Sequence, residues 1–160
     1  LDHVLIFGPP GLGKTTALIS LAAAVTTGGQ WPANGGVAPK GEVVFFTAED
    51  GLADTLRPRF DAAGANSARV HVYQATEARN EETGEFEERD FSLLKDIEVL
   101  DAVLATRPGV SLVIFDPLSA YFGADTDTYK NTKIFNYNVN IFISTYRLLR
   151  VHHLFYPAID

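Results

Sequence analysis

The sequence predicts an α/β fold in which helices cover both faces of a mostly parallel β-sheet. Three apolar runs, at residues 4–7, 42–47 and 110–115, are typical of buried strands. Segments with helical spacing of apolar residues lie between them, and strands that alternate with helices indicate a parallel sheet. The length of 160 residues suits one domain that buries about 70% of its unfolded surface.

A glycine-rich loop follows the first predicted strand. Residues 8–16 read GPPGLGKTT and contain a complete G-x-x-x-x-G-K-[ST] phosphate-binding pattern. A helical pattern over 15–25 comes next, and Gly28-Gly29 stops it. A strand, a glycine-rich turn and a helix N-terminus together form an anion site, because backbone N–H groups and the helix dipole favour phosphate there. The alternative, an ordinary glycine turn, is disfavoured by this context.

The pattern predicts how a nucleotide would be held. We expect Lys14 to contact the β- and γ-phosphates and the Thr15 hydroxyl to hold Mg²⁺. Backbone N–H groups of the loop and of the first helical turn would cradle the phosphates. The predicted nucleotide-binding residues are Gly8, Gly11, Leu12, Gly13, Lys14, Thr15 and Thr16.

The next predicted elements follow in order. A loop rich in Gly and Pro spans 26–41 and leads into the strand at 42–47. Helical spacing predicts a helix over 51–63, which Pro58 should end or bend. A short strand is expected at 69–73.

An acidic stretch lies near the middle of the chain. Residues 77–90 have little apolar content, which favours a solvated loop or an exposed hairpin, with an interaction surface as the alternative. Apolar spacing then predicts an amphipathic helix over 91–105, stopped by Pro108-Gly109. The strand at 110–115 follows and leads into Asp116.

Asp116 is the predicted second acidic element of the site. It follows a buried strand, so its carboxylate would emerge at the carboxyl edge of the sheet, where open α/β folds bind ligands. Together with Thr15 it would organise Mg²⁺ for hydrolysis. The alternative is a helix-capping or turn aspartate before Pro117.

Glu49 is the predicted water-orienting base. It closes the strand at 42–47, and an acid at the tip of a neighbouring strand can face the γ-phosphate across the crevice. In the alternatives, Glu49 and Asp50 cap the helix that starts at Gly51, or Asp50 acts instead. Lys14, Glu49 and Asp116 are therefore the predicted catalytic residues.

Pro117 helps to place the chain among nucleotide-binding proteins. The loop also fits AAA+ ATPases, but there a glutamate follows the strand-end aspartate, and Pro117 occupies that position here. The chain resembles RecA-type ATPases, and more narrowly the RepA/KaiC-like AAA ATPases. The resemblance covers most of residues 1–132, through the segments GPPGLGKTT, VVFFTAED, LRPRFDAAGA and LVIFDPLSAYFG.

This resemblance implies a three-layer P-loop NTPase fold with a RecA-like sheet. It also implies Mg²⁺-dependent ATP hydrolysis, a homo-oligomeric ring such as a hexamer or a filament, and a role in DNA replication or mobilisation with single-stranded DNA as a partner. Arg57 and Arg59 would reach a phosphate of their own or a neighbouring subunit, as the resemblance suggests for their segment. Alternatively they are solvated helix-end arginines.

The chain departs from the family after Asp116. The family continues with a long helix and a strand ending in Thr-His that senses the γ-phosphate. Here Thr145-Tyr146 follows too soon for that helix, so no sensor role is assigned to Thr145 and we expect the sheet to be incomplete. Composition also changes near Lys133, which predicts a partial core over 1–133 and a non-matching tail over 134–160. A domain boundary, a foreign tail and a reading-frame artefact all remain open for this tail.

Bulk properties exclude several classes. A net charge of −7 argues against a broad basic surface for duplex DNA, and the absence of cysteine excludes disulfides and thiolate metal sites. No apolar run approaches 18 residues and no signal peptide is visible, so we expect a cytoplasmic protein without a membrane partner.

The function predicted from sequence is Mg²⁺-dependent ATP binding and hydrolysis that powers a DNA-associated machine, such as a hexameric helicase. GTP is disfavoured because no Asn-Lys-x-Asp segment occurs. The alternative is a nucleotide-dependent binding switch or regulator with weak hydrolysis. A piece that is inactive alone is a third hypothesis, and a small-molecule kinase is the weakest.

Overall fold

The computed structural model defines most of the chain up to Tyr121. The predicted strand at 4–7 (except Ile6), Gly8, Glu49 and the predicted tail at 134–160 lie outside the described part, so these predictions stay open. The described residues are 6, 11–32, 36–48, 55–74, 76–79, 86–89, 91–93 and 95–121.

A three-stranded parallel sheet forms the centre of the described fold. β1 (Glu42–Thr47) lies between β2 (Val70–Tyr73) and β5 (Val110–Asp116), and it is parallel to both. The apolar runs that predicted these strands are buried on both faces of β1, where Val43 to Phe46 are all 3% exposed or less. The predicted parallel sheet is confirmed, with strand boundaries within one residue of those expected.

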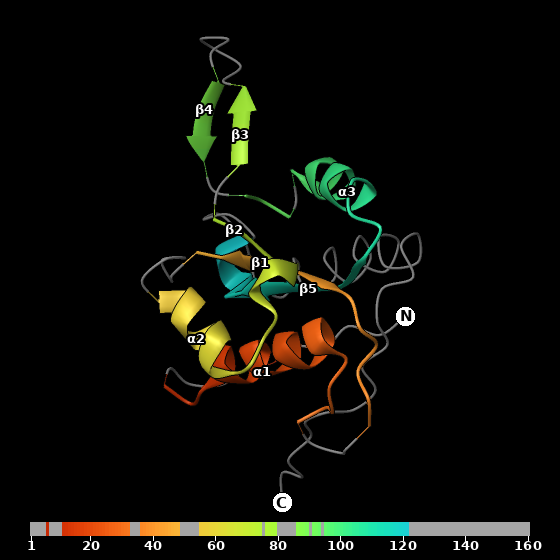
Figure 1. Ribbon diagram of the computed structural model, residues 1–160. Coiled ribbons are helices and arrows are strands. Elements are labelled where there is room, and N and C mark those ends of the chain that lie inside the picture. Colours follow the sequence, from red (N-terminus) through yellow and green to blue (C-terminus); the bar gives the residue numbers. More distant parts are fainter. Residues whose placement is uncertain are drawn as a thin grey trace, which may run out of the picture.

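Helices cover both faces of this sheet. α1 (Lys14–Thr27) and α2 (Arg57–Ala62) lie on one face, and α3 (Ile97–Ala105) lies on the other (Figure 1). Side chains alternate along a strand, so Val43 and Phe45 pack with α1 and α2, whereas Val44 and Phe46 pack with α3. The structure therefore has the predicted three-layer α/β architecture of a P-loop NTPase.

α1 runs antiparallel to β1. At its end, Val25 accepts a hydrogen bond from the N–H of Gly41, just before β1 begins (3.0 Å). Fourteen helical residues and six strand residues both span about 20 Å, so the start of α1 reaches the carboxyl edge of the sheet. The helix ends at Gly28, as predicted, where the N–H of Gly28 bonds to the carbonyl of Ala24.

The helix predicted at 51–63 differs from the observed one. α2 covers Arg57–Ala62, preceded by a π-helical turn at 55–56, and residues 51–54 lie outside the described part. Pro58 stands in the first turn of α2, so it does not end the helix. A proline is tolerated there because the first helical N–H groups have no intrahelical acceptor.

The helix predicted at 91–105 begins later than expected. α3 starts at Ile97, because the Asp96 carboxylate accepts a hydrogen bond from the Ser92 N–H (2.7 Å) and closes a turn. Phe91 and Leu93 are buried in the α3-side core without being helical. The predicted helix start at residue 91 was therefore wrong, and the apolar spacing at Phe91 and Leu93 reflects packing in the core instead.

The acidic stretch forms a hairpin. β3 (Thr76–Arg79) pairs antiparallel with β4 (Phe86–Arg89) and projects from the three-stranded sheet (Figure 1). Of the two forms favoured for 77–90, a loop or a hairpin, the structure therefore shows the hairpin. Its use as an interaction surface stays a prediction.

Polar side chains tie the amino edge of the sheet together. The Glu42 carboxylate lies 2.8 Å from Nε2 of His71, and Arg107 Nη1 lies 3.3 Å from the same nitrogen. His71 thereby makes a polar contact that links β1 and β2. The contact lies at the edge opposite the carboxyl ends of the strands.

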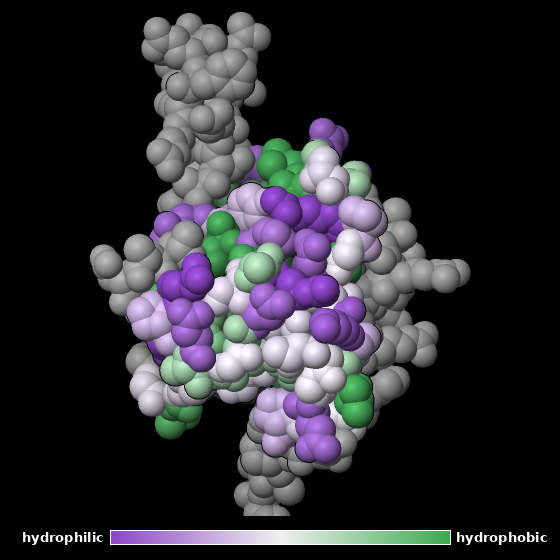
Figure 2. Space-filling model, in the orientation of Figure 1, coloured by the Kyte–Doolittle hydropathy of each residue, from purple (hydrophilic) through white to green (hydrophobic). Residues whose placement is uncertain are grey.

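Two 3₁₀ turns complete the described fold, one before β2 (Ser67–Arg69) and one after β5 (Leu118–Tyr121). On the face shown in Figure 2, hydrophobic residues form separate patches among hydrophilic ones. Among the described helices, none combines the length and the apolar character needed to cross a membrane.

Candidate nucleotide-binding site

The loop before α1 has the backbone of an anion cradle. Gly11 and Gly13 adopt left-handed conformations, with φ of 81° and 79°. Any other residue would be strained at these angles, whereas glycine is not. Among the described residues, no atom lies within 4 Å of a Cβ built on Gly11, so this part of the chain leaves space beside the loop. Left-handed residues in such a turn aim successive N–H groups at one point.

The first turn of α1 extends this cradle. The first intrahelical bond runs from the Ala17 N–H to the Gly13 carbonyl, at 2.9 Å. The N–H groups of Lys14, Thr15 and Thr16 therefore have no acceptor within α1, and Gly13 has no side chain to cap them. Residues 14–17, all of which are described, include no acidic side chain, so the helix dipole is uncompensated by α1 itself. This is the local structure that phosphate binding requires.

Asp116 lies at the same edge and on the same face as this loop. It ends β5 in register with Thr47, the last residue of β1, and the Ala48 N–H reaches its carbonyl at 3.3 Å. Leu112 and Ile114 of β5 pack on the α1 side, so strand alternation puts the Asp116 side chain on that side too. The peptide bond that follows, to Pro117, is cis.

Thr47 is a feature that sequence analysis did not single out. It is 2% exposed, and its alternation with Phe45 places it on the α1 face beside Asp116. A buried hydroxyl at a strand end is therefore part of the surroundings of Asp116. The signal in the sequence is a polar residue that closes an otherwise apolar strand.

Glu49 lies outside the described residues, so its role as base stays a prediction. The structure does place Ala48, one residue earlier, at the end of β1 and next to β5.

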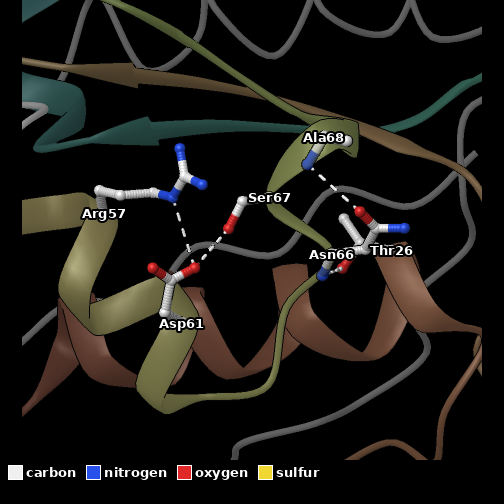
Figure 3. A network of polar contacts seen from close by, with 6 residues as sticks. All are labelled: Thr26, Arg57, Asp61, Asn66, Ser67 and Ala68. Carbon is white, nitrogen blue, oxygen red and sulfur yellow. Dashed lines mark hydrogen bonds and ion pairs between the residues drawn. The ribbon is translucent and has the colours of Figure 1, made fainter.

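Arg57 and Arg59 point in different directions, since residues two apart on a helix differ by roughly 200°. The Arg59 guanidinium donates from Nη2 to the Thr16 hydroxyl, at 3.4 Å, in the first turn of α1. Arg57 instead pairs with Asp61 at 3.4 Å on the exposed side of α2 (Figure 3). Ser67 donates to the same carboxylate, and this bond, with the Arg57 guanidinium adding to it, holds the pKa of Asp61 below its usual range.

The donor set at the carboxyl edge suits a hard divalent cation. The Thr15 hydroxyl and the Asp116 carboxylate are oxygen ligands, and Mg²⁺ prefers one or two such protein ligands together with phosphate and water oxygens. These residues would hold the ion, which when bound would neutralise charge on the phosphates.

Comparison of the sequence with known proteins identifies a family. A family model described as an AAA domain matches residues 2–154, nearly the whole chain. This match runs past Lys133, and because the residues after Tyr121 are not described, the predicted boundary there stays a prediction. Neither curated proteins nor solved structures provide a significant match. The chain belongs to the AAA family of P-loop ATPase domains, and this membership indicates nucleotide binding and hydrolysis.

Proposed function

We propose that this domain binds ATP with Mg²⁺ and hydrolyses it to power a DNA-associated machine, such as a hexameric helicase. The observation that carries the ATPase part is one shared edge. There the glycine loop, the uncapped start of α1 and the strand-end Asp116 all lie on the α1 face. The DNA-associated part is supported by the sequence resemblance to RepA/KaiC-like ATPases.

Each proposed role uses a property of the residue that fills it. Lys14 is the first residue of α1, so its side chain extends from the backbone of the phosphate cradle. Its ammonium group neutralises charge on the β- and γ-phosphates. Thr15 and Asp116 hold Mg²⁺. Glu49 orients the attacking water and accepts its proton. Hydrolysis breaks the bond between the γ-phosphorus and the bridging oxygen, and water supplies the new oxygen of the released phosphate.

The test is ATP hydrolysis by the chain with and without Mg²⁺, measured as phosphate release, and then with added single-stranded DNA. We expect turnover that requires Mg²⁺ and that single-stranded DNA stimulates. Turnover without any DNA effect, together with nucleotide-gated binding of another protein, would favour a regulatory switch. No ATP binding at all would contradict the proposal. A homo-oligomeric ring predicts that ATP raises the mass measured by light scattering.

Glu49→Gln tests the assignment of the base. Because glutamine keeps the size of the side chain but cannot accept a proton, we expect ATP affinity to be retained and turnover to fall by about 10²–10⁴-fold. Asp50→Asn is the matched control, since Asp50 is the adjacent alternative. Loss of turnover in the Asp50 variant alone would move the role to Asp50.

A further inference from the structure

We propose that Arg59 of α2 binds the phosphates of the nucleotide held by the loop of its own subunit. The inference rests on the proposed function, because it adds a ligand to the same nucleotide. It starts from a contact between two segments far apart in sequence. The guanidinium of Arg59 donates to the hydroxyl of Thr16, 3.4 Å away, although 43 positions separate the two residues.

The position of Arg59 is determined by the packing of α2. Leu56, which precedes α2, is fully buried, and Phe60 is 2% exposed, so one face of this short helix is anchored in the core. The Phe60 ring packs edge-on against Phe45 of β1, with ring centroids 5.5 Å apart. Arg59 stands between these anchors and is only partly buried. This packing holds α2 against β1, in the position from which Arg59 reaches Thr16 of α1.

A second contact fixes α2 and its exit against α1. The Asn66 N–H donates to the Thr26 hydroxyl at 3.1 Å, and Thr26 is fully buried near the end of α1 (Figure 3). The region from α2 to Asn66 thus contacts α1 at both ends, through Thr16 and through Thr26. If Arg59 exchanged Thr16 for another partner, the buried Asn66–Thr26 contact would stay in place.

A phosphate is a stronger partner than Thr16 for this guanidinium. The observed bond is long for an N–H···O contact and ends on a neutral hydroxyl. Guanidinium–phosphate bonds are charge-assisted and often bidentate. The start of α1 already combines the Lys14 ammonium with the positive end of the helix dipole. Arg59 adds a third positive group beside the first turn of α1.

The same geometry excludes Arg57 from this role. Its guanidinium is directed to Asp61, which also accepts a 2.6 Å hydrogen bond from Ser67, and the Arg57 side chain is 61% exposed. Arg57 is therefore a matched control, because it has the same chemistry two residues away on the same helix.

The experiment measures binding of ADP and of inorganic triphosphate to the full chain by titration calorimetry. For Arg59→Gln we expect both affinities to fall by about tenfold or more, as loss of a charge-assisted phosphate contact predicts. Arg59→Lys should fall in between, because lysine keeps the charge and loses the fork. Arg57→Gln should change both affinities by less than about twofold, as expected for an exposed ion pair.

Several results would overturn the inference. Unchanged affinities in Arg59→Gln would do so, and the proposed function would stand as long as the parent chain binds ADP. Weaker binding of ADP with unchanged binding of triphosphate would assign Arg59 to the base or ribose instead. If Arg59→Gln does not unfold cooperatively on heating, Arg59→Lys decides: parent-like affinities for both ligands would then reject the phosphate contact. Failure of the parent chain to bind ADP would instead contradict the proposed function itself.

Discussion

Replacement of Lys14 by alanine is expected to abolish measurable ATP turnover. Lys14 is the first residue of α1 and follows the left-handed Gly13, so its side chain starts beside the phosphate cradle. Removal of a charged group that stabilises a phosphoryl transition state typically costs on the order of 10²–10³-fold in rate. ATP affinity should fall as well, because the ammonium also contacts the bound phosphates. Phosphate release and calorimetric titration with ATP measure the two effects.

The control for Lys14→Ala is Lys95→Ala. Lys95 is exposed in the turn before α3, on the opposite side of the sheet from α1. Both variants should keep the thermal midpoint of the parent chain within a few degrees, since neither side chain is part of the buried core. Parent-like turnover in Lys14→Ala would reject the assignment of the catalytic site to Lys14 and its loop, whatever the control shows.

Sequence patterns located β1, β2, β5 and α1 well because their signals are local. β1 and β5 are continuous apolar runs ended by Thr47 and Asp116, which are polar. Glycine flanks both ends of α1, at Gly13 and Gly28, and glycine readily adopts the left-handed conformation found there. Burial on both faces and helix termination are each visible within a few residues of sequence.

The misplaced helix boundaries have non-local causes. Phe91 and Leu93 continue the apolar spacing of α3, yet they pack against β1 and β5 as irregular backbone. Their burial depends on the position of the sheet, which spacing does not encode. Similarly, the effect of Pro58 depends on whether it follows or precedes the start of the helix.

In the candidate site, too, some residues could be predicted from local sequence and others depend on packing. Lys14 and Asp116 were named from a motif and a strand end, and their common edge follows from the parallel order of the strands. The distinction between Arg57 and Arg59 was left open, because it depends on how Leu56 and Phe60 set the rotation of α2 against the sheet. That rotation is a property of the packed core rather than of the segment.

Asp116→Asn is expected to lower Mg²⁺-dependent turnover by about 10²–10³-fold, a loss comparable with that of other charged groups at reacting phosphates. The substitution keeps the shape of the side chain and its place at the end of β5, but removes the negative charge that would attract the cation. Binding of ATP in the presence of EDTA should be retained, because no phosphate contact is assigned to Asp116.

The matched control is Asp101→Asn, on the exposed side of α3. It carries the same chemical change on the other face of the sheet, so turnover and its Mg²⁺ dependence should stay at parent values. The decisive measurement is turnover against Mg²⁺ concentration. If Asp116 holds the ion, the Asn variant needs more Mg²⁺ for half-maximal rate than the parent chain does. An equal Mg²⁺ requirement in both would assign Asp116 to the turn before Pro117, because a capping role depends on hydrogen bonding and not on the cation.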